Sequence, residues 1–215
     1  MILRRMQQLL AQLYDAPIEH DVEDFVIADR QRFTSLTGEQ CEADEQVALV
    51  EEGDGVRIGV FVDEQVLARL QQHDPLDQLD DDNLADYCTA LEGVSHFHYL
   101  MWSLSRTRHV SLLELELQAD VDKYAGAVKL MTHQGRGCFP ATLHQRLFHG
   151  VSYLPGLSAE HRRRYEEANR TAARFCRSLE EKFLRARCSR PEAWLSQVRR
   201  FFRCNQQEKM RLAAF

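Results

Sequence analysis

The 215-residue sequence contains no long apolar run. A helix needs roughly 20 consecutive apolar residues to cross a bilayer, whereas the longest nearly uncharged stretch, Gly93 to Leu104, is shorter and contains two histidines. The first residues place arginines ahead of any apolar segment, and neither a signal-peptide pattern nor a lipidation motif is recognisable. These absences predict a cytoplasmic protein that has no membrane partner.

The sequence also lacks the motifs of several common chemistries. It has no P-loop, no dinucleotide-binding glycine fingerprint, no H-E-x-x-H and no G-x-S-x-G. None of its six cysteines forms a C-x-x-C pair, so no zinc module is predicted. Cys138 lies beside Arg136 in a glycine-rich segment, but no catalytic partner for a nucleophile is recognisable around it.

Acidic and basic residues are unevenly distributed along the chain, although the overall net charge is only −6. Residues 1–133 contain 26 acidic and 10 basic side chains, which gives a net charge of −16. Residues 134–215 contain 7 acidic and 17 basic side chains, which gives +10. Opposite charges favour packing of the two parts against each other, or docking of one part to a partner protein or to a second copy of the chain.

Hydrophobic periodicity in the N-terminal part predicts a helix and a small antiparallel β element. Residues 1–14 have an amphipathic helical pattern. In residues 46–62, apolar side chains recur at every second position on either side of a Gly-Asp-Gly turn at 53–55, which is typical of a β-hairpin. A short apolar run at 25–28 can add a third strand. Residues 29–45 are mostly polar, so we expect a loop there.

The remainder of the chain predicts helices. A short helix follows Asp63 and ends near Asp74, where a proline comes next. We therefore predict one α+β domain, mainly α, in which an α/β subregion (1–75) packs on a helical subregion (76–215) that forms a bundle. The longer predicted helices lie near 80–104, 110–132, 140–149, 158–187 and 191–211.

Two of these helices carry polar stripes that we predict to be buried. Glu92 is the only formal charge in residues 87–104, and a solvent-facing helix normally carries more. His96 lies one turn after Glu92, so the two side chains can touch. The following helix has apolar residues on two sides and is expected to lie between other elements, which places Glu116 and Asp120 near the interior.

Buried carboxylates need a partner, a proton or a metal ion. Ion pairing within the protein is the ordinary solution, and Asp120 can pair with Lys123 at i,i+3. Arginines of the basic part can neutralise the other acids. In that interpretation no cofactor is expected.

The alternative is a divalent metal or acid–base site formed by Glu92, His96, Glu116 and Asp120 on facing helices, although the E-x-x-H motif of helical di-metal proteins is absent. A polar pocket for a ligand or a partner peptide is a third possibility.

Two other residues on these helices suggest packing. His98 points about 200° away from His96 on a helix, so we expect a core histidine with a hydrogen-bond partner. Gly126 falls within one of the two apolar faces of the second helix, where a glycine permits the close approach of another element.

The predicted helix 158–187 contains the arginines that are candidates for contact with a partner or a nucleic acid. Arginines with neighbouring aromatic residues can bind phosphates and bases. Glutamates interrupt the basic face, however, and the whole chain is acidic, which disfavours nucleic-acid binding. The candidate contact residues are Arg162, Arg163, Arg164, Arg170 and Arg174.

Our first functional hypothesis is therefore a soluble cytoplasmic interaction or accessory protein without catalytic activity, which docks a partner protein or itself through oppositely charged surfaces. The first alternative is a helical-bundle enzyme or metal-binding protein with a Glu/His/Asp site between helices 83–104 and 110–132. The second alternative is nucleic-acid binding through the arginine-rich C-terminal helices. Whether the protein is an enzyme stays open at this point.

Overall fold

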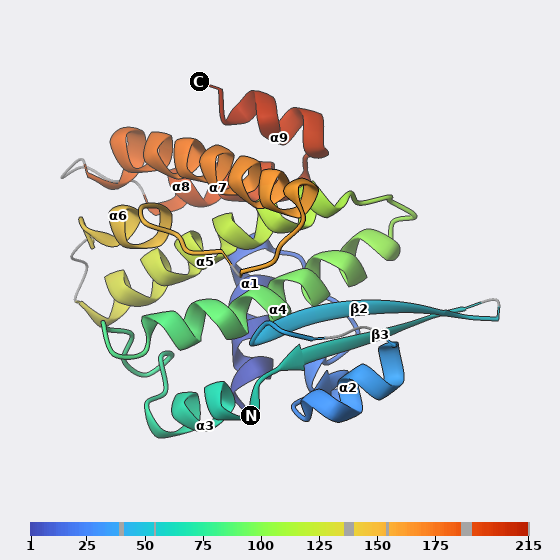
Figure 1. The fold of residues 1–215 in the computed structure, drawn as a ribbon. Coiled ribbons are helices and arrows are strands. Elements are labelled where there is room, and N and C mark those ends of the chain that lie inside the picture. Colours follow the sequence, from blue (N-terminus) through green and yellow to red (C-terminus); the bar gives the residue numbers. More distant parts are fainter. Residues whose placement is uncertain (39–40, 54, 136–139, 154, 186–190, 215) are drawn as a thin grey trace.

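A small sheet formed by the N-terminal part of the chain packs on a stack of helices (Figure 1). The α+β class with a mainly helical composition, which the sequence predicts, is confirmed. The computed structural model describes residues 1–38, 41–53, 55–135, 140–153, 155–185 and 191–214.

The sheet has three strands in the order β1-β3-β2. Strands β2 (Glu45–Glu52) and β3 (Gly55–Val62) form the predicted antiparallel hairpin. The short strand β1 (Val26–Ile27) adds to β3 in parallel, so the sheet is mixed rather than purely antiparallel as predicted. Strand β2 therefore lies at an edge of the sheet.

The helices form successive layers on the sheet. Helix α2 covers one face of the sheet and α4 covers the other; α5 packs on α4, and α7 packs on α5 (Figure 1). Helix α1 crosses α4 and also contacts α8. The helices are α1 (Ile2–Tyr14), η1 (Val22–Asp24), α2 (Arg30–Thr37), α3 (Glu64–Gln72), α4 (Leu84–Leu104), α5 (Leu112–Gln134), α6 (Leu143–Phe148), α7 (Ala159–Leu179) with its π-helical continuation η2 (Glu180–Leu184), α8 (Pro191–Arg203) and α9 (Gln206–Leu212).

Two predictions about secondary structure are wrong. The segment 29–45, expected to be a loop, contains α2, which Asp29 caps and which ends at Gly38 with a positive φ of 73°. Only Phe33 of α2 is fully buried, so the apolar residues of this segment do not recur with a helical period. The single helix expected at 191–211 is divided into α8 and α9, because Asn205 begins a new helix with a capping box to Glu208.

Helices α4 and α5 lie in the interior of the molecule, and both are buried on several sides, as predicted for their polar stripes. A Cβ atom at Gly126 would lie 2.5 Å from the hydroxyl oxygen of Tyr87, so the glycine permits the close approach of α4 to α5. His98 is buried, as expected for a core residue, and burial lowers its pKa to about 4. Contrary to expectation, neither of its ring nitrogens makes a hydrogen bond of good geometry.

The basic and acidic parts of the chain are in contact, although only some of these contacts are ion pairs. Arg146 pairs with Asp81 at 2.5 Å. Arg199 and Arg203 instead donate to backbone carbonyls at the C-terminal end of α1, where helix carbonyls lack partners within the helix. Some of the basic side chains in residues 134–215 therefore make their interactions within the fold.

The predictions about membrane spans and about cysteines can also be compared with the structure. None of the described helices combines the length and the apolar composition that crossing a membrane requires. Cys138 lies outside the described residues. The described cysteines, all free thiols, are Cys41, Cys88, Cys176 and Cys204.

Candidate metal centre

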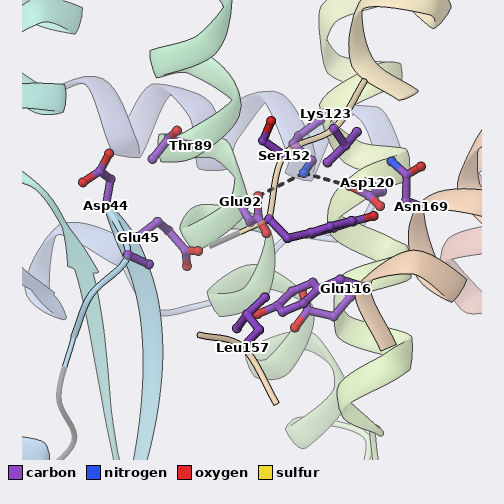
Figure 2. Close-up of a pocket in the computed structure, with 14 residues that line it drawn as sticks. Asp44, Glu45, Thr89, Glu92, Glu116, Asp120, Lys123, Ser152, Leu157 and Asn169 are labelled. Atoms are coloured by element: carbon purple, nitrogen blue, oxygen red, sulfur yellow. Dashed lines mark hydrogen bonds and ion pairs between the residues drawn. The ribbon is translucent and has the colours of Figure 1, made fainter. Parts of the chain in front are cut away.

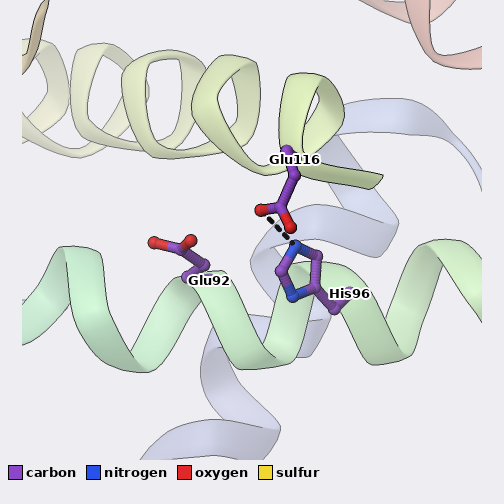
Figure 3. A group of neighbouring side chains, drawn as sticks. All are labelled: Glu92, His96 and Glu116. Atoms are coloured by element: carbon purple, nitrogen blue, oxygen red, sulfur yellow. Dashed lines mark ion pairs between the residues drawn. The ribbon is translucent and has the colours of Figure 1, made fainter. Parts of the chain in front are cut away.

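Three of the four acidic and histidine residues singled out in the sequence meet between α4 and α5. Glu92 and His96 lie one turn apart on the face of α4 that is turned toward α5, and Glu116 points back from α5 (Figure 3). One donor atom from each of the three lies within 4.8 Å of the other two. His96 and Glu116 are each only 9% exposed.

The His96 ring lies between two carboxylates. Its Nε2 is 3.5 Å from Oε2 of Glu116, and its Nδ1 is 3.6 Å from Oε1 of Glu45, the first residue of β2. Burial lowers the pKa of His96, but the interactions with Glu116 and Glu45 outweigh burial and raise this pKa well above its usual value. The two carboxylates therefore favour the protonated form of the ring. Sequence reasoning missed Glu45.

Several polar atoms of this group are buried without a hydrogen bond. They include Oε1 of Glu45, Nε2 of His96 and Nε of Arg164. The separations of 3.5 and 3.6 Å around His96 exceed normal hydrogen-bond lengths. Buried polar atoms without partners are uncommon in native proteins and call for an explanation. We refer to Glu45, Glu92, His96 and Glu116 as the open cluster, and Arg164 borders it.

The fourth predicted residue, Asp120, is paired elsewhere. Its carboxylate lies 2.8 Å from the ammonium of Lys123, which confirms the predicted i,i+3 pair, and the same ammonium lies 2.9 Å from Glu92 (Figure 2). Burial lowers the pKa of Lys123, but Asp120 and Glu92 outweigh burial and raise it well above the usual value. Lys123 therefore neutralises Asp120 and borders the open cluster as a fixed positive charge.

Only one of the five candidate arginines reaches this region. Arg164 on α7 places Nε 3.8 Å from Oε1 of Glu116, and its guanidinium lies 5.5 Å from the ring centre of Tyr165. The interaction with Glu116 is long for an ion pair, so it neutralises Glu116 only in part. The other four arginines are exposed on α7, and they are Arg162, Arg163, Arg170 and Arg174.

The open cluster faces a cavity on each side. One cavity, of about 400 Å³, is lined by both polar and apolar residues, and the polar ones include Lys123 and Asn169 (Figure 2). The other, of about 590 Å³, includes the apolar residues Leu49 and Leu112. Residues that line both cavities include Glu45, Glu92 and Glu116. An ion or a substrate can therefore reach the cluster.

A second polar group lies elsewhere in the interface of the same two helices, and its atoms are satisfied. Asp122 on α5 accepts hydrogen bonds from the hydroxyl of Tyr14, the hydroxyl of Ser95 (2.6 Å) and the amide of Gln118 (2.6 Å). Lys209 of α9 donates to Gln118. We refer to these five residues as the closed cluster.

Burial dominates the titration of the closed cluster. It raises the pKa of Asp122 to about 6, against the effect of the hydrogen bonds that this carboxylate accepts. Burial also lowers the pKa of Lys209 to about 7, although Glu114 and Asp122 favour the charged ammonium. Nothing in the sequence indicated that a lysine from the C-terminal helix joins this group.

Comparison of the chain with protein-family models, curated proteins and solved structures returned no significant match. The geometry of the open cluster and its cavities is therefore the main indication of function.

Proposed function

We propose that this protein binds one divalent transition-metal ion through Glu92, His96 and Glu116, and that the ion serves as a Lewis acid in a hydrolytic enzyme. The observation that carries this proposal is the convergence of three donor atoms within 4.8 Å of one another. Two facing helices supply them, at the junction of two cavities. A bound ion would give the orphaned Nε2 of His96 a partner.

The donor set indicates which ions fit. Carboxylates suit Mg²⁺, Ca²⁺ and Mn²⁺, whereas imidazole suits zinc, iron, nickel and copper. A site with two carboxylates and one imidazole thus favours Mn²⁺, Fe²⁺ or Zn²⁺. Three protein ligands leave at least one coordination position open, as is typical of catalytic rather than structural metal sites. The adjoining cavities allow water or substrate to occupy that position.

Glu45 supports the assignment from the second coordination shell. Metal-binding histidines usually donate their other ring N–H to a carboxylate, which fixes the tautomer and the ring orientation. In this protein Nε2 of His96 faces Glu116 and Nδ1 faces Glu45, so Nε2 is left for the ion. Glu45 would hold the ring in that orientation.

Positive side chains border the same site and suit hydrolytic chemistry. The ammonium of Lys123 touches Glu92, and the guanidinium of Arg164 lies near Glu116. Preorganised positive groups stabilise negative charge that develops on an oxygen during hydrolysis. A metal-bound water has a strongly lowered pKa and is a nucleophile at neutral pH.

Docking through oppositely charged surfaces and nucleic-acid binding stay predictions. The four exposed arginines of α7 support them. Arg164, by contrast, lies beside Glu116, and Arg199 and Arg203 bind the end of α1. These internal contacts leave fewer basic side chains for a partner, so the metal site is the better supported proposal.

The direct test is calorimetric titration of chelator-treated protein with Mn²⁺ and with Zn²⁺. We expect one ion per chain, and thermal stabilisation by roughly 2–3 kcal/mol when the free ion is at about 100 times its dissociation constant. His96→Gln should weaken binding at least tenfold. His98→Gln, the same substitution two residues further along α4, is the matched control and should bind normally.

Absence of stoichiometric binding of either ion to the folded wild-type protein would overturn the proposal. Equal loss of binding in the two histidine variants would also contradict it, because His98 points away from the site. Circular dichroism of each variant separates loss of binding from loss of folding.

A further inference from the structure

We infer that the two cavities form one groove that binds an extended peptide segment of neutral or basic character, whose backbone pairs with the free edge of β2. The inference rests on the proposed metal centre for the identity of the reaction, because the peptide would be its substrate. The groove can bind the peptide whether or not the ion is present.

The floor of the groove is one stripe of α4. Thr89, Glu92, His96 and Leu100 line the cavities, and these residues are spaced three or four positions apart on a single helix face. With a rise of 1.5 Å per residue, the stripe is roughly 16 Å long. An extended peptide advances about 3.3 Å per residue, so the groove accommodates about five residues. The open cluster lies in its middle.

Strand β2 forms one wall of the groove and offers unpaired backbone groups. The backbone N–H of Asp63 donates to the carbonyl of Asp44 at 2.9 Å, which makes this a hydrogen-bonded pair of the antiparallel ladder. Because such pairs alternate, Glu45, Val47 and Leu49 direct their N–H and C=O groups to the free edge. No other strand pairs with that edge among the described residues. A free strand edge recognises an extended peptide by backbone hydrogen bonds.

Apolar residues line one end of the groove. Leu49 is 49% exposed and Leu112 is 58% exposed, although large aliphatic side chains are normally buried. Both line the same cavity, together with Val47, Leu100 and Leu115. This end of the groove fits one aliphatic or aromatic side chain of the peptide.

The charge of the groove excludes polyanions as ligands. Two cationic side chains, Lys123 and Arg164, lie among the carboxylates that line it, and a divalent ion would still leave an acidic surface. A nucleic acid would be repelled, whereas a neutral or basic peptide would not. The acidic lining residues are Glu42, Asp44, Glu45, Glu92, Glu116 and Asp120.

The substrate class follows from these features together. A peptide carbonyl placed over His96 would lie beside the proposed ion. Hydrolysis would form a bond between the oxygen of water and the carbonyl carbon, and would break the C–N bond. One water proton would go to the leaving amine nitrogen, so no other reactant is needed.

Fluorescence polarisation can test peptide binding directly. The probe is a labelled library of peptides of about seven residues, with leucine fixed at the centre and Lys, Ala, Ser and Val at the other positions. We expect saturable binding to the chelator-treated protein. Leu112→Glu should weaken it at least tenfold, because a charge would enter the apolar end. Leu104→Glu is the matched control, since Leu104 is similarly exposed at 55% but does not line the groove.

A backbone variant tests the pairing with β2. Val47→Pro removes one N–H from the free edge, where proline is tolerated in edge strands, and should weaken peptide binding about tenfold. An acidic library with Glu in place of Lys, and a single-stranded oligonucleotide, should both bind at least tenfold more weakly than the basic library.

The outcomes separate this inference from the metal proposal. Normal metal binding with no peptide binding, or stronger binding of the oligonucleotide than of the peptide library, would overturn the inference alone. Equal effects of Leu112→Glu and Leu104→Glu would also overturn it. Saturable peptide binding by a protein that binds neither Mn²⁺ nor Zn²⁺ would overturn the metal proposal and leave peptide binding by the groove standing.

Discussion

The open and closed clusters lie in the interface of the same two helices, but they differ in how their polar atoms are satisfied. In the closed cluster, three donors surround the carboxylate of Asp122 at hydrogen-bond distance. In the open cluster, His96 lies 3.5 and 3.6 Å from its nearest carboxylate oxygens. Burial of an acid therefore does not by itself mark a functional site. Buried polar atoms that lack a hydrogen-bond partner and face a cavity are a better indication of a functional site.

The largest expected effect comes from breaking the closed cluster. Asp122→Ala leaves the hydroxyls of Tyr14 and Ser95 and the amide of Gln118 without their acceptor, and it removes a counter-charge of Lys209. We expect the free energy of unfolding to fall by roughly 3–5 kcal/mol, as when one partner of a buried charged network is removed. Urea denaturation measures this change. A loss under about 1 kcal/mol would show that the closed cluster is not structural.

A pH-dependent effect should come next. Burial lowers the pKa of Lys209 to about 7 in the folded protein, whereas the usual lysine value is 10.5. Between these values the unfolded chain binds more protons, so a rise in pH favours the folded state. Relative to Lys209→Met, wild-type stability should therefore increase by roughly 2–4 kcal/mol from about pH 7 to about pH 10. Urea denaturation across that range measures the difference, and a constant difference would contradict the expectation.

A smaller effect is expected at the edge of the open cluster. Glu45→Gln weakens the acceptor that orients His96, so the affinity for the metal ion should fall about 10- to 100-fold. Calorimetric titration with Zn²⁺ measures the affinity. Glu42→Gln is the matched control, because Glu42 is exposed and is not one of the carboxylates that pair with His96. Unchanged affinity in Glu45→Gln would remove Glu45 from the second coordination shell.

The smallest effect should be that of Glu116→Gln on the stability of chelator-treated protein. Glu116 has two long interactions, of 3.5 Å with His96 and 3.8 Å with Arg164, so little binding energy is lost. We expect a change within about 1 kcal/mol in the free energy of unfolding, while metal binding is strongly reduced. A loss as large as that of Asp122→Ala would make the open cluster a structural element like the closed one.

Part of the site could be predicted because it lies on regular helices. The shortage of charge around Glu92 and the two apolar faces of the next helix indicated that their polar residues face the interior, and Glu92, His96 and Glu116 do meet. The same geometry predicted that Asp120 pairs with Lys123. The helical period alone was sufficient to predict where these residues lie.

The rest of the site depends on tertiary contacts that periodicity does not specify. Glu45 follows a polar segment at the start of a strand, and nothing local indicates that β2 packs beside His96. Arg164 lies in a run of three arginines, and only the packing of α7 on α5 selects it. The capping box at Asn205 and Glu208, in contrast, is a readable signal for the division of the last predicted helix.

The contact between α1 and α8 has a consequence for biosynthesis. The apolar face of α1 is completed by a helix that lies almost 190 residues later, and the ribosome adds about 5–20 residues per second. Tyr14, which is fully buried and stacks on Phe202 of α8 with ring centres 4.3 Å apart, therefore waits roughly 10–40 s for this partner. Until α8 is synthesised, the part of α1 that it covers lacks this neighbour and leaves apolar surface exposed, as in folding intermediates that are prone to aggregate.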